Sequence, residues 1–103
     1  MELSGRALVG TVLAAEPLAG ARTPAYVLDI DFGEAGLKRS SAQITYLYTA
    51  EELVGSQVVA LVDLSAKRIA CVVSECLVLG VQTPQGVVIL KPERTVGNGS
   101  EVF

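Results

Sequence analysis

The sequence contains no histidine and no tryptophan, and aromatic residues make up only 5% of the chain. Without histidine, Ser-His-Asp and Cys-His catalysis are excluded, as is every metal site that needs imidazole. Charged residues are also scarce, at 18% against roughly 25% in soluble domains, whereas 50% of the residues are apolar. A chain of 103 residues forms a single domain with one modest core. The surplus of apolar side chains therefore predicts a subunit interface or an apolar binding surface.

The charge balance argues against a purely electrostatic partner. The net charge is −3 and the sequence pI is about 4.8, so contact with nucleic acid would need a local basic cluster. The first residues do not resemble a signal peptide, and no run approaches the roughly 18 consecutive apolar residues of a membrane span. Neither a P-loop nor a dinucleotide fingerprint is present. We therefore expect a cytoplasmic protein without membrane insertion, metal or cofactor.

The two cysteines, Cys71 and Cys76, are five positions apart in the sequence. In an extended segment this odd separation places the side chains on opposite faces of a sheet, about 16 Å apart and beyond disulfide reach. Two cysteines alone do not form a zinc site. We interpret both as packing thiols, with a reactive thiol as the alternative.

Short apolar runs separated by glycine, proline and small polar residues predict strands along most of the chain. The clearest run is 25–32, where one face carries Tyr26, Leu28, Ile30 and Phe32 and the other carries Asp29 and Asp31. This alternation is typical of a half-buried strand. We also expect strands at 8–15, 37–45, 57–64, 75–81 and 87–90, with turns at 65–68 and 82–86. The strand at 57–64 is nearly all apolar, which indicates cover on both faces.

One short helix is predicted between the third and fourth strands. Thr49 and Glu52 have the spacing of a capping box, in which each residue's side chain bonds the other's backbone N–H, and Gly55 is the expected stop. A helix at this place is the arrangement of the OB-fold, a five-stranded Greek-key barrel. We therefore predict a mainly β, five-stranded OB-fold barrel with extra C-terminal strands, formed by residues 1–103. An SH3-like barrel and a small sandwich are the alternatives.

Asp29 and Asp31 are the best-placed pair of carboxylates in the sequence. They lie about 6.6 Å apart along one strand face. That spacing is compatible with acid–base chemistry or with a divalent cation. No third ligand or partner base is near them in the sequence, so a solvated strand face is the simpler interpretation.

The basic residues gather in two polar segments. Lys38 and Arg39 begin the third strand, Lys67 and Arg68 follow the fourth, and Arg22 lies in the first long turn. We expect the two pairs to form one patch in a barrel, because clustering is needed for any nucleic-acid role. Donors to phosphate, ribose or a peptide backbone would come from Arg39, Ser41 and Gln43 on one strand face, and from Lys67, Arg68 and Ser74. An ordinary solvated surface is the simpler alternative.

Four blocks of sequence are similar to one known family. They are Asp31-Phe32-Gly33 and the segments 38–45 (KRSSAQIT), 67–70 (KRIA) and 74–80 (SECLVLG). These blocks resemble CsaA-type chaperones, which belong to the tRNA-binding domain family also appended to methionyl- and phenylalanyl-tRNA synthetases. The resemblance implies an OB-fold homodimer without enzymatic activity that binds unfolded or presecretory polypeptides and the translocation motor SecA, or, in other branches, tRNA. By position, it implies as site residues Lys38, Arg39, Ser41, Gln43, Lys67, Arg68, Ser74 and Glu75.

One departure from the family pattern favours polypeptide binding over tRNA binding. Cys71-Val72-Val73 replaces a glycine and a polar or basic residue, which removes charge from the tRNA-facing loop. We therefore expect a homodimeric CsaA-like chaperone, with a structural tRNA-binding protein as the alternative and an enzyme as the least supported class. An extended client would add to a strand edge, with apolar pockets beside Tyr26 or Leu77. The apolar strand at 58–64 indicates a dimer, and segment 87–103 would suit pairing across its axis.

Overall fold

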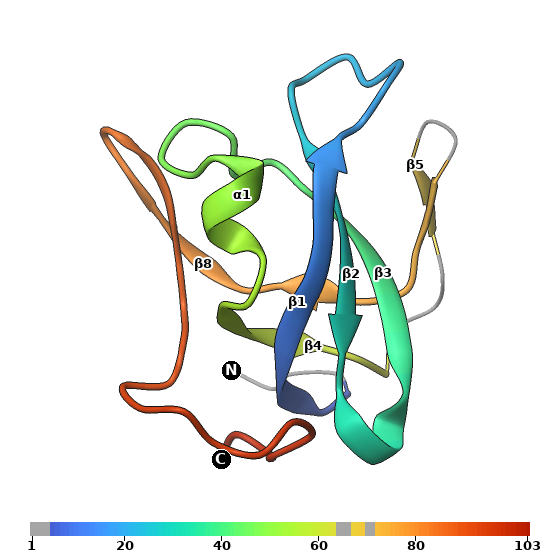
Figure 1. Cartoon of the computed structure of the whole chain (residues 1–103). Helices are drawn as coiled ribbons and strands as arrows, with labels where there is room; N and C mark the ends of the chain where they lie inside the picture. Colours follow the sequence, from blue (N-terminus) through green and yellow to red (C-terminus); the bar gives the residue numbers. More distant parts are fainter. Residues whose placement is uncertain (1–4, 64–66, 70–71) are drawn as a thin grey trace.

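The computed structural model describes residues 5–63, 67–69 and 72–103 and shows a mainly β protein (Figure 1). The strands are β1 (Ala7–Pro17), β2 (Tyr26–Asp31), β3 (Leu37–Ala42), β4 (Gln57–Leu61), β5 (Lys67–Ile69), β6 (Val72–Ser74), β7 (Leu77–Val78), β8 (Gly80–Thr83) and β9 (Gly86–Ile89). A 3-10 turn, η1 (Gly33–Ala35), joins β2 to β3, and the helix α1 (Ala50–Leu53) lies between β3 and β4. The predicted helix position and the extra C-terminal strands are therefore confirmed.

Five strands form one antiparallel sheet in the order β3-β2-β1-β4-β7, and β5–β6 and β8–β9 form two hairpins. β1 pairs with two strands: residues 11–17 pair with β2, and residues 7–11 pair with β4. A register shift between Val12 and Ala14 bends β1 as it passes from one to the other. The link between β6 and β7 bonds to β3 where the Glu75 backbone N–H donates to the Arg39 carbonyl oxygen at 2.8 Å, which brings the two terminal strands of the sheet together. The sheet thus curls into a nearly closed barrel, which confirms the predicted OB-type fold.

The alternating strand β2 supplies the centre of the core. Leu28, Ile30 and Phe32 are each fully buried, as the predicted apolar face requires. Gly10 of β1 lies directly over them, because a Cβ atom there would come within 2.7 Å of the Ile30 and Phe32 side chains. Tyr26, at the end of the same face, is half-buried, and its hydroxyl donates to the Tyr48 carbonyl oxygen at 2.8 Å. Burial on one face of β2 therefore sets the barrel's register.

The helix α1 has the predicted capping box. The Thr49 hydroxyl accepts from the Glu52 backbone N–H at 3.2 Å, and the Glu52 carboxylate accepts from the Thr49 backbone N–H at 2.8 Å. Gly55 follows with a φ of 89° and donates to the Val12 carbonyl oxygen at 2.8 Å. Leu53 is buried in the core, so this short helix closes one end of the barrel beside β1 (Figure 1). In the described residues, no helix is long and apolar enough to cross a membrane.

Several of the predicted boundaries are wrong. The strand expected at 37–45 ends at Ala42, the strand expected at 57–64 ends at Leu61, and the turn expected at 82–86 is shortened because β8 extends to Thr83 and β9 begins at Gly86. Lys67 and Arg68, expected in a polar turn at 65–68, lie in β5, because β6 supplies antiparallel partners for them; residues 65–66 fall outside the described residues. The single strand expected at 75–81 is divided into β7, which pairs with β4, and β8, which pairs with β9. The division comes at Leu79, whose N–H donates to the Val59 carbonyl oxygen and whose carbonyl accepts from the Leu90 N–H. Long-range pairing, which local sequence does not reveal, decides these last two cases.

The C-terminal strap, residues 96–102, covers the part of β1 that β2 does not reach. Val9 donates to the Ser100 carbonyl oxygen at 2.9 Å and accepts from the Gly99 N–H at 2.7 Å, and Val102 donates to the Ala7 carbonyl oxygen at 2.8 Å. A Cβ atom at Gly99, whose φ is 90°, would come within 2.6 Å of the Phe32 carbonyl oxygen. Much of the segment expected to pair across a dimer axis, 87–103, is thus paired within its own chain through β9 and the strap.

Candidate functional site

Three of the predicted site residues lie on the outer side of β3 and its continuation. Arg39 and Gln43 are exposed and Ser41 is half-buried, whereas the intervening Ser40 and Ala42 are buried. Successive side chains of a strand point to opposite faces. The structure therefore brings Arg39, Ser41 and Gln43 to one side of the barrel.

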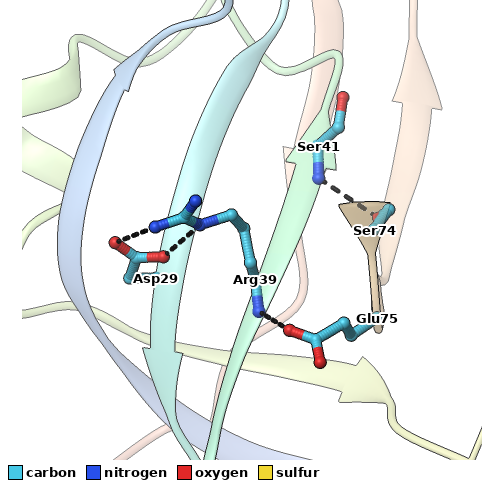
Figure 2. Close-up of polar contacts among 5 residues, drawn as sticks. All are labelled: Asp29, Arg39, Ser41, Ser74 and Glu75. Carbon is cyan, nitrogen blue, oxygen red and sulfur yellow. Dashed lines mark hydrogen bonds and ion pairs between the residues drawn. The ribbon is translucent and has the colours of Figure 1, made fainter. Parts of the chain in front are cut away.

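Arg39 forms an ion pair with Asp29, its cross-strand partner on β2 (Figure 2). The Arg39 Nε lies 2.8 Å from Asp29 Oδ1, and its terminal nitrogen Nη2 lies 3.5 Å from Oδ2. The hydrogen bond to Asp29, followed by the charge of that carboxylate, raises the pKa of Arg39. Both side chains keep contact with solvent, at 53% and 38% exposure, so water and salt screen the pair. Arg39 is therefore charged and still accessible to a ligand.

Ser74 and Glu75 join the end of β6 to β3 (Figure 2). The Glu75 carboxylate accepts from the Arg39 backbone N–H at 3.0 Å, beside the backbone bond that closes the barrel. The Ser74 hydroxyl accepts from the Ser41 backbone N–H at 3.3 Å and donates to the Cys76 carbonyl oxygen at 3.2 Å. These bonds give the serine–glutamate pair a structural task, which is to fix the edge of β3 at this point.

Cys76 lies directly behind this junction. Its side chain is a buried free thiol, and burial raises its pKa to about 11. The buried Ser40 hydroxyl donates to the Cys76 carbonyl oxygen at 3.0 Å. The thiol is therefore protonated and shielded at neutral pH, as a packing thiol should be. The second cysteine, Cys71, lies outside the described residues.

A groove of about 850 Å³ begins where the junction between β3 and β7 ends. We call this depression the groove; its walls come from the 18–25 loop, the continuation of β3, β7 and the β8–β9 hairpin. Ser74 and Glu75 occupy the outer edge of β3 at Arg39 and Ser41. Beyond Ala42, the continuation of β3 at Gln43 and Ile44 has no strand partner within the described residues, so an unpaired backbone edge lies beside the groove. The lining residues are Gly20, Ala21, Arg22, Thr23, Ala25, Ser41, Ala42, Gln43, Ile44, Leu77, Val78, Gly80, Gln82 and Val87.

A second, smaller depression of about 630 Å³ lies on the outer face of β1, β2 and β3. It contains the Asp29–Arg39 ion pair, Glu75 and Lys38. Leu13 and Leu37 also line it and are 49% and 66% exposed. The predicted site residues are thus divided: Ser41 and Gln43 line the groove, and Lys38, Arg39 and Glu75 line the second depression.

Lys67 and Arg68 stand on the β5–β6 hairpin. Lys67 is opposite Ser74, whose hydroxyl bonds the backbone of Ser41. The backbone of this basic pair is therefore one strand away from the junction between β6 and β3. The course of the two side chains lies outside what the structure describes, so the single basic patch stays a prediction.

The two strand-face carboxylates serve different partners. Asp29 faces Arg39, whereas Asp31 accepts from the Gly33 backbone N–H at 2.8 Å and from the Asn98 amide at 3.4 Å. Asp31 thereby stabilises the turn after β2 and the C-terminal strap. The structure gives both carboxylates partners within the chain, whereas the simpler interpretation expected only a solvated strand face.

Arg22, Ile44 and Val87 of the groove were not predicted to lie together. They are distant in the sequence. The position of Val87 also depends on the break between β7 and β8 at Leu79, because that break determines where the β8–β9 hairpin lies. Leu77 was expected beside an apolar pocket, and it does line the groove. The signal that could have located Arg22 is its position in the loop that follows β1, one of the two loops that flank an OB-fold's binding surface.

The comparisons with known proteins bear on this geometry. A family model described as "Putative tRNA binding domain" matches residues 8–101. The chain belongs to this family. Methionine–tRNA ligases of Leptospira biflexa and Methanothrix thermoacetophila are 34% and 36% identical to it over 91 residues. These matches cover 88% of this chain but 13% of each ligase, so the chain spans only a small part of their length.

Solved structures of similar proteins share this fold over nearly the whole chain. Chaperone CsaA from Bacillus anthracis is 47% identical, with a TM-score of 0.89, over 95% of this chain and 90% of that one. CsaA chaperone protein from Picrophilus torridus is 38% identical, with a TM-score of 0.90, over 95% and 91%. A protein related to methionyl-tRNA synthetase from Pyrococcus horikoshii is 25% identical, with a TM-score of 0.83, over the full length of both chains. The resemblance to CsaA-type proteins is therefore confirmed.

Proposed function

We propose that this protein is a non-enzymatic, homodimeric chaperone of the CsaA type that binds unfolded or presecretory polypeptides. The observation that carries the proposal is the groove beside the unpaired continuation of β3 at Gln43 and Ile44. Unfolded chains present two things that folded proteins hide, namely apolar side chains and unpaired backbone groups. A site for them needs an apolar surface next to a strand edge, and the groove combines both.

The composition of the groove also fits a ligand without a fixed sequence. Leu77, which is 50% exposed, and the half-buried Val87 supply accessible apolar surface, while the exposed Gln43 amide in the same lining can both donate to and accept from a backbone. Strand pairing recognises the main chain, and shallow pockets accept many side chains. The 47% identity to a CsaA chaperone over nearly the whole chain supports the same assignment.

A homodimer would use apolar surface that one barrel leaves exposed. Large apolar side chains that remain accessible include Leu13, Leu37, Val81, Val88, Leu90, Val96, Val102 and Phe103. A single small domain has no core for these residues, and burial between two copies would remove them from water. By its resemblance to CsaA-type proteins, we further propose the translocation motor SecA as a partner and the cytoplasm as the location.

The proposal is tested by light scattering of a heat-denatured reporter protein across a titration of this protein. Holding is passive, so suppression of aggregation should increase with the molar ratio and should be the same with or without ATP. It should also persist at moderate salt, because apolar burial and backbone pairing respond weakly to ionic strength. Aggregation that continues at several-fold molar excess would remove the chaperone proposal.

The second candidate function is structural tRNA binding. It is favoured by the family match and by the position of Lys67 beside the junction of β6 with β3. If it holds, replacing Lys67 and Arg68 by alanine should weaken tRNA binding uniformly and lower the salt slope by about 2. Replacing Lys91 and Arg94, an exposed basic pair elsewhere on the surface, is the matched control. A tRNA affinity that is absent, or unchanged in the first variant, would leave this function without a site.

A further inference from the structure

The groove carries a charge that distinguishes it from the rest of this acidic protein. Arg22 is the only charged residue among the described residues that line it. The other arginines with described side chains, Arg6, Arg39 and Arg94, each form an ion pair with a carboxylate. Arg22 is exposed, and no such pair involves it within the described part of the chain. Its guanidinium is therefore available to a ligand.

Arg22 shares the groove with apolar, small and uncharged polar residues. Ala21 and Ala25 come from the same loop, and Leu77 and Val87 are apolar residues of the same lining. Small lining residues leave room for the side chains of a ligand, and the apolar walls favour aliphatic ones. An arginine beside such a surface binds a carboxylate well, because its planar donors match the two oxygens and the nearby apolar surface reduces competition from water.

We propose that the groove binds extended polypeptide segments in which aliphatic residues lie next to an aspartate or glutamate, and that it discriminates against segments rich in lysine and arginine. This inference rests on the proposed chaperone function and adds the class of client. The net charge of −3 repels an acidic segment only at long range, because physiological salt screens charges beyond about 8 Å. Within the groove, the contact with Arg22 decides the preference.

The test uses three peptides of about ten residues, each with a neutral fluorophore. They share an alanine-, valine- and isoleucine-rich sequence and differ at one central position, which is glutamate, glutamine or lysine. Binding is measured by fluorescence anisotropy at physiological salt. The glutamate peptide should bind about threefold more tightly than the glutamine peptide, as a partly exposed ion pair allows. The lysine peptide should bind most weakly.

Two variants with the same change of charge test whether Arg22 causes this order of peptide affinities. Arg22→Glu should reverse it, so that the lysine peptide binds best. Arg94→Glu makes the same charge change at an exposed arginine outside the groove and should leave the order unchanged. An order that survives in Arg22→Glu, or that also reverses in Arg94→Glu, would overturn the inference.

A steric pair of variants separates this inference from the chaperone proposal. Gln43→Trp places a large ring at the exposed edge of the groove, whereas Gln85→Trp places it on the β8–β9 turn, outside the lining. Peptide binding should fall at least tenfold in the first variant only. If all peptides bind equally and aggregation is still suppressed, the chaperone function stands and the acidic preference is wrong. If no peptide binds and aggregation is not suppressed, the proposed function itself fails.

Discussion

Replacing Asn98 by alanine removes the side chain that fastens the C-terminal strap to the barrel. The Asn98 amide oxygen accepts from the Thr11 hydroxyl at 2.7 Å and from the Gln57 amide at 3.1 Å, and its nitrogen donates to Asp31 at 3.4 Å. A hydrogen bond of this kind contributes about 0.5–1.5 kcal/mol net. The bond to Asp31 is long, so we count the other two. The expected loss in the free energy of unfolding is about 2 kcal/mol.

The assay is thermal unfolding followed by circular dichroism, at one fixed protein concentration because association alters the midpoint. For a domain of this size, a loss of 2 kcal/mol lowers Tm by about 8–16 °C. Gln85→Ala is the control, since this exposed amide should change stability by no more than about 0.5 kcal/mol. An Asn98→Ala midpoint as close to the parent protein as that control would refute our assignment of the strap to Asn98.

The variant Asn98→Asp adds a pH dependence with a definite sign. It keeps an acceptor for Thr11 and Gln57 but places a second carboxyl next to Asp31, where the amide nitrogen had donated. Repulsion between two carboxylates raises the pKa of one of them in the folded state. The variant should therefore be destabilised at pH 7 and should regain stability as the pH falls towards 4, because the folded state binds the extra proton more readily. A deficit that is constant over this range would contradict the geometry.

Three further predictions follow from local contacts. Thr49→Ala removes one half of the capping box and should cost about 1 kcal/mol, measured by urea unfolding. Gly99→Ala forces a Cβ atom towards the Phe32 carbonyl oxygen at a left-handed φ and should cost about 2 kcal/mol or more by the same measurement. In a Cys71→Ser background, Cys76 should react with iodoacetamide far more slowly in the folded than in the unfolded protein at pH 8, because its folded pKa is about 11. Equal rates would contradict its burial.

The parts of the fold that depend on local pattern could be predicted from the sequence. The alternation through Leu28, Ile30 and Phe32 places β2, because burial on one face requires a period of two. Thr49 and Glu52 place the start of α1, because both halves of a capping box lie within one turn. The helix between the third and fourth strands was then sufficient to select the OB-fold over the alternatives.

The parts that depend on distant partners could not be predicted. Lys67 and Arg68 look like a turn, yet they form a strand because β6 folds back on them. No local pattern reveals the bonds of Asn98 to Thr11 and Gln57, which join residues 87 and 41 positions apart in the sequence. In the candidate site, the common face of Arg39, Ser41 and Gln43 follows from strand alternation and could be predicted. The meeting of Arg22 with Gln43 in one groove could not.

The most direct test of the polypeptide proposal offers both ligands to the protein at once. A permanently unfolded reporter, reduced and alkylated, and bulk tRNA are given different fluorophores and mixed with the protein at equal concentration. Co-sedimentation is then measured from low to moderate salt. We expect the unfolded reporter to sediment with the protein throughout, with little tRNA in the complex, because apolar burial and backbone pairing resist salt. A complex that contains tRNA at low salt, loses it as salt increases and never contains the reporter would contradict the proposal.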